Sequence, residues 1–402
     1  MSEEMANVER PIVAHIHGSF FAGSETFIYQ YISRLEKFKP VCVAQCFVNL
    51  DQFPFPREDM YPLSAKRYSL RWLYRAFNNR VLNRNPALIR ALKETGCSLL
   101  HAHFGTSGCI ALPAKRRLRL PLVTTFYGFD LSKREHVERY RERYKRLFAE
   151  GDLFLVEGPF MRERLIELGC PPEKIEIQRI AIPVRDIPFQ ARRPKAKGEK
   201  AILLFAGRFV EKKGLGYLIG AVATASRERD DFELRLIGSG PREEEIKAQV
   251  EGHGLADRVV FLGFLPYKRY LEELREADIF IHPSVTASDG DSEGGAPTVI
   301  LEAQASGLPV LTTDHADIPN VVVPGKSALL SPERDWEGLA GNLLRLLEEQ
   351  DRWEEMGRAG RYFIEERHDI EKEVHGLEDK YMMLMHGKQQ ANEPGGQAWE
   401  SA

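Results

Sequence analysis

Short apolar runs alternate with amphipathic segments along the first half of the chain. Segments 24–38 and 159–169 carry apolar residues at helical spacing, and the second one ends in a glycine, as helices often do. Between such segments lie runs with the length and composition of buried strands: 11–20, 40–48, 98–105, 121–130 and 152–158. Strand alternating with helix predicts a parallel sheet that is covered on both faces.

The second half repeats this pattern. Its strand-like runs lie at 201–208, 232–240, 259–265, 278–284 and 308–314, each followed by a helical segment or a polar loop. The two halves meet at 180–200, which is rich in Pro, Lys and Arg, as linkers between domains tend to be. The sequence therefore predicts an α/β protein with two doubly wound domains. Ligands of such sheets bind beyond the carboxyl ends of the strands, here in the cleft where the domains face each other.

We place an N-terminal Rossmann-like domain at 1–184 and a C-terminal one at 185–368. A helical pattern at 369–388 is expected to cross back to the first domain, and the polar residues 389–402 are expected to form a disordered tail. Residues 1–185 hold 29 Lys and Arg against 20 Asp and Glu, whereas the remainder holds 27 against 39. This opposite charge balance supports two separately built domains.

Composition is that of an ordinary globular protein, with 43% hydrophobic and 29% charged residues. No apolar run approaches the roughly 18–20 residues that a membrane-spanning helix needs. The N-terminal ten residues are polar and lack an apolar signal core, so we expect a cytoplasmic protein. No nucleic-acid-binding module is recognisable, and a nicotinamide dehydrogenase is disfavoured because no G-x-G-x-x-G follows the first strand of either half.

The loop and helix at 289–310, DGDSEGGAPTVILEAQASGLPV, combine acidic residues with a bare backbone. Gly294 and Gly295 precede a predicted helix start, where exposed N–H groups bind anions and glycines let a phosphate approach closely. Glu302 lies about a turn and a half into that helix, where a carboxylate suits the two hydroxyls of a ribose. Asp289 and Asp291 have the spacing of a metal-binding pair, but a loop role is favoured beside Glu293.

A basic turn follows the first strand of the second half. Gly207 and Arg208 come directly after the strand, and Lys213 follows a few residues later. An arginine and a lysine at a strand end are suited to clamp a nucleoside diphosphate and to stabilise it as it departs. Ser239 and Gly240, in LIGSGP, follow the next strand of the same predicted sheet. A solvated basic turn remains the alternative for this segment alone.

Five motifs in the second half together resemble the nucleotide-binding domain of glycosyltransferase family 4, whose members are retaining enzymes of the GT-B fold: GRFVEKKG, LIGSGP, FLGFLP, ADIFIHPS and EGGAPTVILEAQASGLPV. In the first half, FFAGSETFIYQYISRL, HAHFG, TTFYGFD and MRERLIELGCPPEKIEI are similar to the exopolysaccharide branch of that family, which includes colanic acid and amylovoran glycosyltransferases. The resemblance covers nearly the whole chain.

The resemblance implies roles for individual residues. Arg208 and Lys213 would bind the donor diphosphate, Glu302 the ribose, and Glu293 the transferred sugar. Glu293, Arg208 and Lys213 are then the catalytic candidates. The donor-binding candidates are Glu302, Gly207, Gly294, Gly295, Ser239, Gly240, Phe264 near the base, and Gly23. The donor would be a UDP- or GDP-sugar, and the reaction would need neither a metal nor another cofactor.

The chain departs from the family pattern at three places. Eight residues separate Glu293 from Glu302 where seven are usual, Ala22 precedes Gly23 where a second glycine is usual, and Tyr127 stands where many members have a histidine. A tyrosine donates a hydrogen bond but does not act as a base at neutral pH. On the acceptor or sugar side, the candidates are His101, His103, Tyr127 and Asp130, with satisfied structural histidines and a turn or cap aspartate as the alternatives.

Basic residues interleaved with aromatic or apolar ones at 65–84 and 114–120 have the composition of a surface that rests on an anionic membrane. Peripheral membrane contact would suit a lipid-linked glycan acceptor, but a solvated helix face has the same pattern. The resemblance thus predicts sugar transfer from a nucleotide donor to a glycan or lipid-linked acceptor, in bacterial surface polysaccharide synthesis. Two alternatives remain: a GT-B-fold sugar-nucleotide epimerase and a non-catalytic nucleotide-binding subunit.

Overall fold

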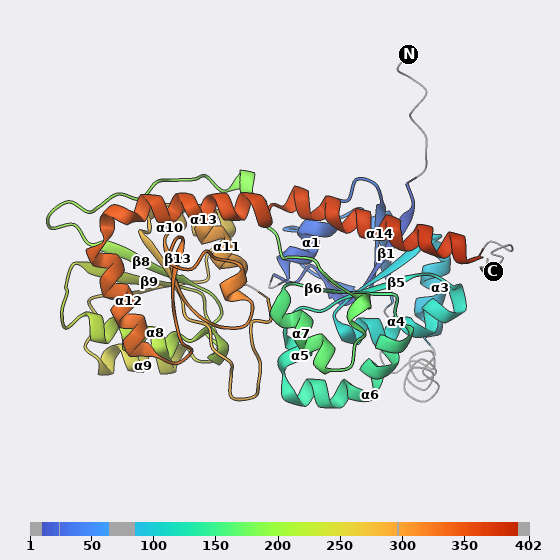
Figure 1. Ribbon diagram of the computed structural model, residues 1–402, viewed down its shortest axis with the longest axis horizontal. Coiled ribbons are helices and arrows are strands. Elements are labelled where there is room, and N and C mark those ends of the chain that lie inside the picture. The colour runs from blue at the N-terminus through green and yellow to red at the C-terminus, as the bar shows by residue number, and fades with distance from the viewer. Residues whose placement is uncertain (1–9, 24, 64–84, 296, 393–402) are drawn as a thin grey trace, which may run out of the picture.

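The computed structural model describes residues 10–23, 25–63, 85–295 and 297–392. They form two lobes that lie side by side, each a parallel sheet with helices on both faces (Figure 1). The strand orders are β3-β2-β1-β4-β5-β6-β7 in the N-terminal lobe and β10-β9-β8-β11-β12-β13 in the C-terminal lobe. Both orders reverse direction beside the first strand of the lobe, as doubly wound sheets do. The predicted fold class is confirmed.

Among its described residues, the N-terminal lobe has seven strands: β1 (Ile12–Phe20), β2 (Lys39–Phe47), β3 (Met60–Pro62), β4 (Leu99–His103), β5 (Leu122–Thr125), β6 (Leu153–Val156) and β7 (Ile175–Ile177). Its α-helices are α1 (Thr26–Ile32), α3 (Pro86–Thr95), α4 (Gly105–Leu118), α5 (Phe129–Ser132), α6 (Arg134–Glu150) and α7 (Pro159–Glu167). Short 3₁₀ turns lie at η1 (Arg57–Asp59), η2 (Pro172–Lys174) and η3 (Val184–Asp186).

The C-terminal lobe is built on six strands: β8 (Ala201–Ala206), β9 (Phe232–Ile237), β10 (Val259–Gly263), β11 (Ile279–His282), β12 (Val310–Thr313) and β13 (Ala328–Ser331). Its α-helices are α8 (Leu215–Ala225), α9 (Glu243–Gly252), α10 (Tyr267–Glu276), α11 (Thr298–Ala305), α12 (Trp336–Glu348) and α13 (Trp353–Arg367). Its 3₁₀ turns are η4 (Glu211–Lys213), η5 (Ile318–Asn320) and η6 (Gln350–Arg352).

The final helix, α14 (Ile370–Asn392), leaves the C-terminal lobe and packs along the N-terminal one (Figure 1). Ile370, Val374, Leu377 and Tyr381 of α14 are buried against strand residues of the N-terminal sheet that include Val13. Burying these side chains is what fixes the helix to the far lobe. The helix continues past residue 388 to Asn392, so 389–392 are helical rather than part of a tail, and the rest of that expected tail lies outside the described residues.

The linker between the lobes is joined to the start of α14 by a pair of backbone hydrogen bonds. The Ile182 N–H donates to the carbonyl of His368 at 3.0 Å, and the Ile370 N–H donates to the carbonyl of Ile182 at 3.1 Å. His368 Nδ1 also lies 2.7 Å from the Ile180 carbonyl oxygen. The two chain crossings between the lobes therefore run side by side and are joined to each other.

Two expected helix bounds differ from those observed. The helix expected within 24–38 is confined to Thr26–Ile32, and the helix expected after Gly295 begins at Thr298. No described helix is long and apolar enough to cross a membrane.

Candidate functional site

The first loops of the C-terminal sheet pack backbone against backbone at the carboxyl ends of β8 and β9. Gly238 has φ +129°, and a Cβ on it would lie 1.9 Å from the carbonyl oxygen of Gly207. A Cβ on Gly240 would meet the Phe209 carbonyl oxygen at 2.6 Å, while the Ser239 carbonyl accepts from the Phe209 N–H at 2.8 Å. Only glycine fits this approach, and Arg208, between Gly207 and Phe209 in the first loop, has an exposed side chain.

Lys213 and Glu293 form a buried ion pair beside these loops. Lys213 Nζ lies 2.9 Å from Oε1 and 3.0 Å from Oε2 of Glu293, with side chains 12% and 7% exposed. Ser284 Oγ donates to the same carboxylate at 3.1 Å. Burial by itself would raise the pKa of Glu293, but the ammonium groups of Lys213 and Lys212 outweigh it and lower that pKa to about 2. Glu293 is therefore an anion throughout the neutral range.

The lysine of this pair has a lowered pKa. Burial is the largest cause, opposed by Glu293 and reinforced by the positive charges of Lys212 and Arg208. These three cations thus influence one another at the strand ends, on a turn that is held by Gly214 at φ +68° against the Pro283 carbonyl. Lys213, one of the expected diphosphate ligands, is thus already paired with Glu293 in this structure.

Glu302 lies on α11, and a different set of neighbours sets the pKa of its carboxyl. Burial raises the pKa of its carboxyl to about 7, while the hydroxyls of Tyr270 and Tyr267 act in the opposite direction. Both tyrosines come from α10, which begins just after the 83% exposed Phe264 at the end of β10. Burial and these two tyrosines thus set the pKa of Glu302, whereas Glu293 is paired with Lys213, so the two acidic candidates have different surroundings.

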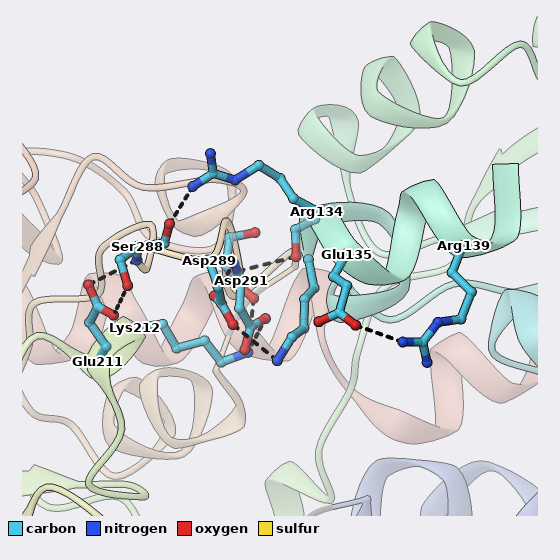
Figure 2. Close-up of polar contacts among 11 residues, drawn as sticks. Arg134, Glu135, Arg139, Glu211, Lys212, Ser288, Asp289 and Asp291 are labelled. Carbon is cyan, nitrogen blue, oxygen red and sulfur yellow. Dashed lines mark hydrogen bonds and ion pairs between the residues drawn. The ribbon is translucent and has the colours of Figure 1, made fainter.

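The loop that follows β11 bridges the two lobes (Figure 2). On the C-terminal side, Ser288 bonds to Glu211 through its N–H at 2.9 Å and its hydroxyl at 2.7 Å, and Lys212 Nζ lies 3.1 Å from Asp291. On the N-terminal side, Lys133 Nζ lies 3.0 Å from Asp289. The two carboxylates of the Asp-Gly-Asp segment are thus engaged by lysines, in keeping with the favoured loop role.

Arg134 adds two contacts from the N-terminal lobe to this loop. Its backbone N–H donates to the Asp289 carbonyl at 3.2 Å and its guanidinium to the Ser288 carbonyl, and Figure 2 shows the side chain reaching across to the loop. Ser132 Oγ accepts from the Ser292 N–H at 3.2 Å. We call residues 286–295 the bridging loop, because it contacts both the clamp turn η4 and the start of α6.

Glycines set the closest approach between the lobes. A Cβ on Gly294 would lie 2.2 Å from the Cα of Gly128, which itself has φ +93°, and one on Gly295 would lie 1.7 Å from Glu157 Oε2. Burial, reinforced by Asp317 and Asp130, raises the pKa of Glu157 well above its usual range. The structure is therefore a closed form in which an N-terminal-lobe carboxyl covers the glycines ahead of α11.

Asp317 ties the lobes together at the same place. Its carboxylate oxygens accept from the backbone N–H groups of Phe160 at 2.9 Å and Met161 at 3.1 Å, at the first turn of α7. A Cβ on Gly158 would come within 2.4–2.6 Å of this carboxyl. A side chain of the C-terminal lobe thus caps a helix of the N-terminal lobe.

The acceptor-side candidates are mostly engaged in the N-terminal lobe. His101 and His103 are each 2% exposed, and His103 Nδ1 lies 2.7 Å from the Tyr127 hydroxyl. Asp130 is fully buried and accepts from the N–H groups of Gly105 at 2.8 Å and Tyr127 at 3.1 Å. The two histidines are hydrogen-bonded to Tyr381, Thr125 and Tyr127, and Asp130 has the cap geometry that was the alternative. Gly23 is exposed, with nothing within 4 Å of a Cβ built on it.

Sequence reasoning missed several residues of the site. Glu157 follows β6 directly, and a charged residue at the end of an apolar run was a signal in DLFLVEG. Tyr267 and Tyr270 left no such signal, since their distance from Glu302 in the sequence hides their contact. Lys133 and Arg134 looked like ordinary residues of a charged helix.

Family models match both lobes. Residues 186–363 match the model described as glycosyl transferases group 1, and residues 22–182 match glycosyltransferase family 4. Amylovoran biosynthesis glycosyltransferase AmsK of Erwinia amylovora is 37% identical over 264 residues, 65% of this chain and 64% of its own length. A putative colanic acid biosynthesis glycosyltransferase, WcaL of Salmonella typhimurium, is 38% identical over 60% of this chain and 59% of its own length. The matches thus span less than two thirds of these relatives.

Solved structures match over nearly the whole chain. Anabaena HepE in complex with UDP and glucose has a TM-score of 0.74 at 15% identity, covering 93% of this chain and 100% of its own. The apo form of the lipopolysaccharide outer core galactosyltransferase WaaB has a TM-score of 0.69 at 18% identity, covering 94% and 99%. At such low identity these matches show the shared fold.

Proposed function

The chain belongs to the glycosyltransferases of the GT-B fold, since family models match each of its lobes, and we propose that it transfers a sugar from a nucleotide-diphosphate donor to a glycan or lipid-linked glycan. The kinship with amylovoran and colanic acid glycosyltransferases supports a place in bacterial exopolysaccharide synthesis. The single observation that carries the proposed activity is the clustering of Arg208, Lys213 and Glu293 beside the glycine-lined strand ends.

The donor would lie across the carboxyl edge of the C-terminal sheet. Arg208 and Lys213 meet the diphosphate, whose four or so exposed oxygens suit an arginine fork and a lysine point charge. Gly294 and Gly295 would offer their backbone to the phosphates once the Glu157 carboxyl, which covers them in this structure, has moved aside. Glu302 accepts from the ribose hydroxyls when it is ionised, and exposed Phe264 offers a face to the base. The UDP held by the structural neighbour HepE supports UDP, and GDP is the other candidate.

In the proposed reaction the bond between the anomeric carbon and the diphosphate oxygen breaks as a bond to the acceptor hydroxyl oxygen forms. The acceptor proton passes to the departing phosphate, which gains charge that Arg208 and Lys213 stabilise. Attack on the face that the phosphate leaves retains the anomeric configuration and needs no protein nucleophile. Glu293 is placed to contact the transferred sugar, and binding of the diphosphate would draw Lys213 partly away from it.

Charge on the diphosphate would be met by these side chains, and we propose that the transfer step needs no metal. Removing Arg208 tests the donor site without unfolding risk, because its side chain is exposed. We expect Arg208→Ala to lower the rate of sugar transfer at least tenfold, with Arg139→Ala as the control. Unchanged transfer in Arg208→Ala would contradict the site. Conversion of donor alone into an isomeric nucleotide sugar would instead indicate an epimerase.

Peripheral membrane contact remains part of the proposal, because a lipid-linked acceptor would lie at a membrane surface. Within 114–120, Lys115 already pairs with Asp152 at 2.5 Å, and Arg116 pairs with Glu150, so part of that charge is met within the protein. The segment 65–84 lies outside the described residues. Co-sedimentation with anionic but not neutral vesicles at moderate salt would support the contact, and no co-sedimentation would end it.

A further inference from the structure

Three histidines of the N-terminal lobe point into one buried space. His15 on β1 pairs in parallel register with His101 on β4, and His103 follows two residues later on the same face of that strand. All three are buried, with exposures of 0%, 2% and 2%. One ligand atom from each lies within 4.8 Å of those from the other two. This histidine triad belongs to none of the donor-site groups described above.

The spacing of the three rings matches that of three ligands around one ion. Their centroids are 5.2, 5.3 and 4.5 Å apart. With a metal–nitrogen distance of about 2.0–2.1 Å, each imidazole centroid lies about 3.2 Å from a bound ion, and tetrahedral angles place two centroids about 5 Å apart. His15 Nδ1 and His103 Nε2 are 3.0 Å apart, against about 3.3 Å for two tetrahedral nitrogen ligands.

Hydrogen bonding within the triad leaves one nitrogen without a partner. His15 Nδ1 bonds to His103 Nε2, while His15 Nε2 is buried and has no partner among the described residues. If Nδ1 carries the proton, Nε2 is a bare lone pair; in the other tautomer it is an N–H with no acceptor. An ion held by His15 Nδ1 and His103 Nε2 would replace the hydrogen bond between these two nitrogens and would fix the proton of His15 on Nε2, which keeps no acceptor among the described residues.

The outer nitrogens are already held as those of metal ligands usually are. His103 Nδ1 lies 2.7 Å from the Tyr127 hydroxyl, and His101 Nδ1 bonds to the Tyr381 hydroxyl of α14. Such partners fix the ring orientation and tautomer of ligating histidines. His101 Nε2 lies 2.7 Å from Thr125 Oγ1, so a hydroxyl oxygen is at hand beside the triad.

Space and protonation state also suit an ion. A cavity of about 20 Å³ is lined by the triad together with Tyr31, Thr125 and Tyr127, which is room for one water-sized species. Burial lowers the pKa of His101 to about 3 and those of His15 and His103 well below their usual value.

We propose that His15, His101 and His103 bind one divalent transition-metal ion of the zinc class, with a fourth position open to the cavity. Neutral imidazoles are ligands that Zn²⁺ favours, and a three-histidine set with an open position is one of its known arrangements. The ion would join β1 to β4 and, through Tyr381, to α14. It lies in the lobe opposite the proposed diphosphate clamp, so this proposal stands or falls independently of sugar transfer.

The test uses the full chain without an affinity tag, stripped of metal by a chelator and checked for native circular dichroism. Titration with Co²⁺ is expected to produce visible d–d absorption that saturates at one ion per chain and is lost on adding Zn²⁺. Elemental analysis after dialysis against Zn²⁺ should give the same stoichiometry. His15→Gln and His103→Gln should each lose stoichiometric binding, whereas the exposed control His253→Gln should keep it.

A variant that keeps all three ligands guards against unfolding as the cause. Tyr127→Phe removes only the hydroxyl behind His103 and is expected to weaken the affinity for Co²⁺ by about 10–100-fold. The proposal is overturned if the folded, metal-free native chain shows no Co²⁺ absorption, which would mean that the cavity holds water. It is also overturned if folded His15→Gln binds the ion as well as the native chain does.

Discussion

Both carboxylate oxygens of Glu293 lie within 3.0 Å of the ammonium nitrogen of Lys213, so the lysine expected to hold a diphosphate is already paired with an acid. This pair is buried between the clamp turn η4 and the bridging loop. It accounts for the low pKa of Glu293, and it makes the site sensitive to the removal of either partner.

Removing one member of this pair should destabilise the protein. Lys213→Met leaves a buried carboxylate unpaired, and we expect the free energy of unfolding to fall by about 3–5 kcal/mol. The double variant Lys213→Met/Glu293→Gln should lose clearly less than the two single variants combined, because neither charge is left alone. Urea unfolding monitored by circular dichroism measures this. Additive losses would contradict the coupling, and Arg139→Ala, in an exposed pair, should stay within about 0.5 kcal/mol.

Ionisation of Glu302 should control donor affinity near neutral pH. With a pKa of about 7, this carboxyl is mostly ionised at pH 8, whereas at pH 6 only about a tenth is ionised. If the carboxylate accepts hydrogen bonds from the ribose hydroxyls, the affinity for the nucleotide should weaken up to about tenfold from pH 8 to pH 6. Calorimetric titration of UDP or GDP measures this. Glu302→Gln should bind the nucleotide more weakly, and its affinity should depend less on pH. If the affinity of both proteins changes equally between pH 6 and pH 8, Glu302 does not bind the ribose as a carboxylate.

The same group makes a prediction for stability. Its folded-state pKa is raised above the unfolded value of about 4.5, so the folded protein binds more protons between pH 4.5 and 7. Glu302 therefore favours folding at low pH, and this contribution is lost as the pH rises through that window. Glu302→Gln should flatten the decline in unfolding free energy from pH 5 to 7. If the unfolding free energy of the variant declines with pH as steeply as that of the native chain, other groups cause the decline.

The contacts of Lys133 and Arg134 with the bridging loop should hold the lobes closed. Ala at both positions removes the ion pair to Asp289 and the guanidinium contact to Ser288, and we expect a larger radius of gyration in solution scattering. Arg139→Ala is the matched control, because Arg139 lies on the same helix and pairs only locally with Glu135 (Figure 2). Exposed charges are screened by salt, so the native chain should also open as ionic strength rises. An unchanged radius of gyration in the double variant would contradict the idea that these contacts hold the lobes closed.

Gly295→Ala should also open the lobes, for a steric reason. The new Cβ would lie 1.7 Å from Glu157 Oε2, so the closed form cannot form unchanged. We expect sugar transfer to fall by about a hundredfold, the cost of misplacing reacting groups by about 1 Å. Adding Glu157→Ala should restore part of the loss, while Gly341→Ala, where nothing lies within 4 Å, should have no such effect. Failure of Glu157→Ala to restore activity would place the damage elsewhere.

The alternation of strands and helices predicted the fold because each long buried strand leaves an apolar run. The edge strands β3, β7 and β13 were missed; β3 and β7 have only three residues each, too few to carry a pattern. Motifs at the strand ends located Arg208, Lys213 and Glu293, because the carboxyl ends of parallel strands meet at one edge. Contacts made by closure, such as Glu157 with Gly295, depend on how two lobes meet and leave no periodic trace in the sequence.

Equilibrium binding of a nucleoside diphosphate tests the central claim most directly. Calorimetric titration of UDP and of GDP into the native chain should show saturable one-to-one binding of at least one of them. Arg208→Ala should weaken that binding at least tenfold, and Arg139→Ala should leave it unchanged. Binding of neither nucleotide, or equal affinity in the native chain and Arg208→Ala, would contradict a diphosphate site at the ends of the C-terminal strands.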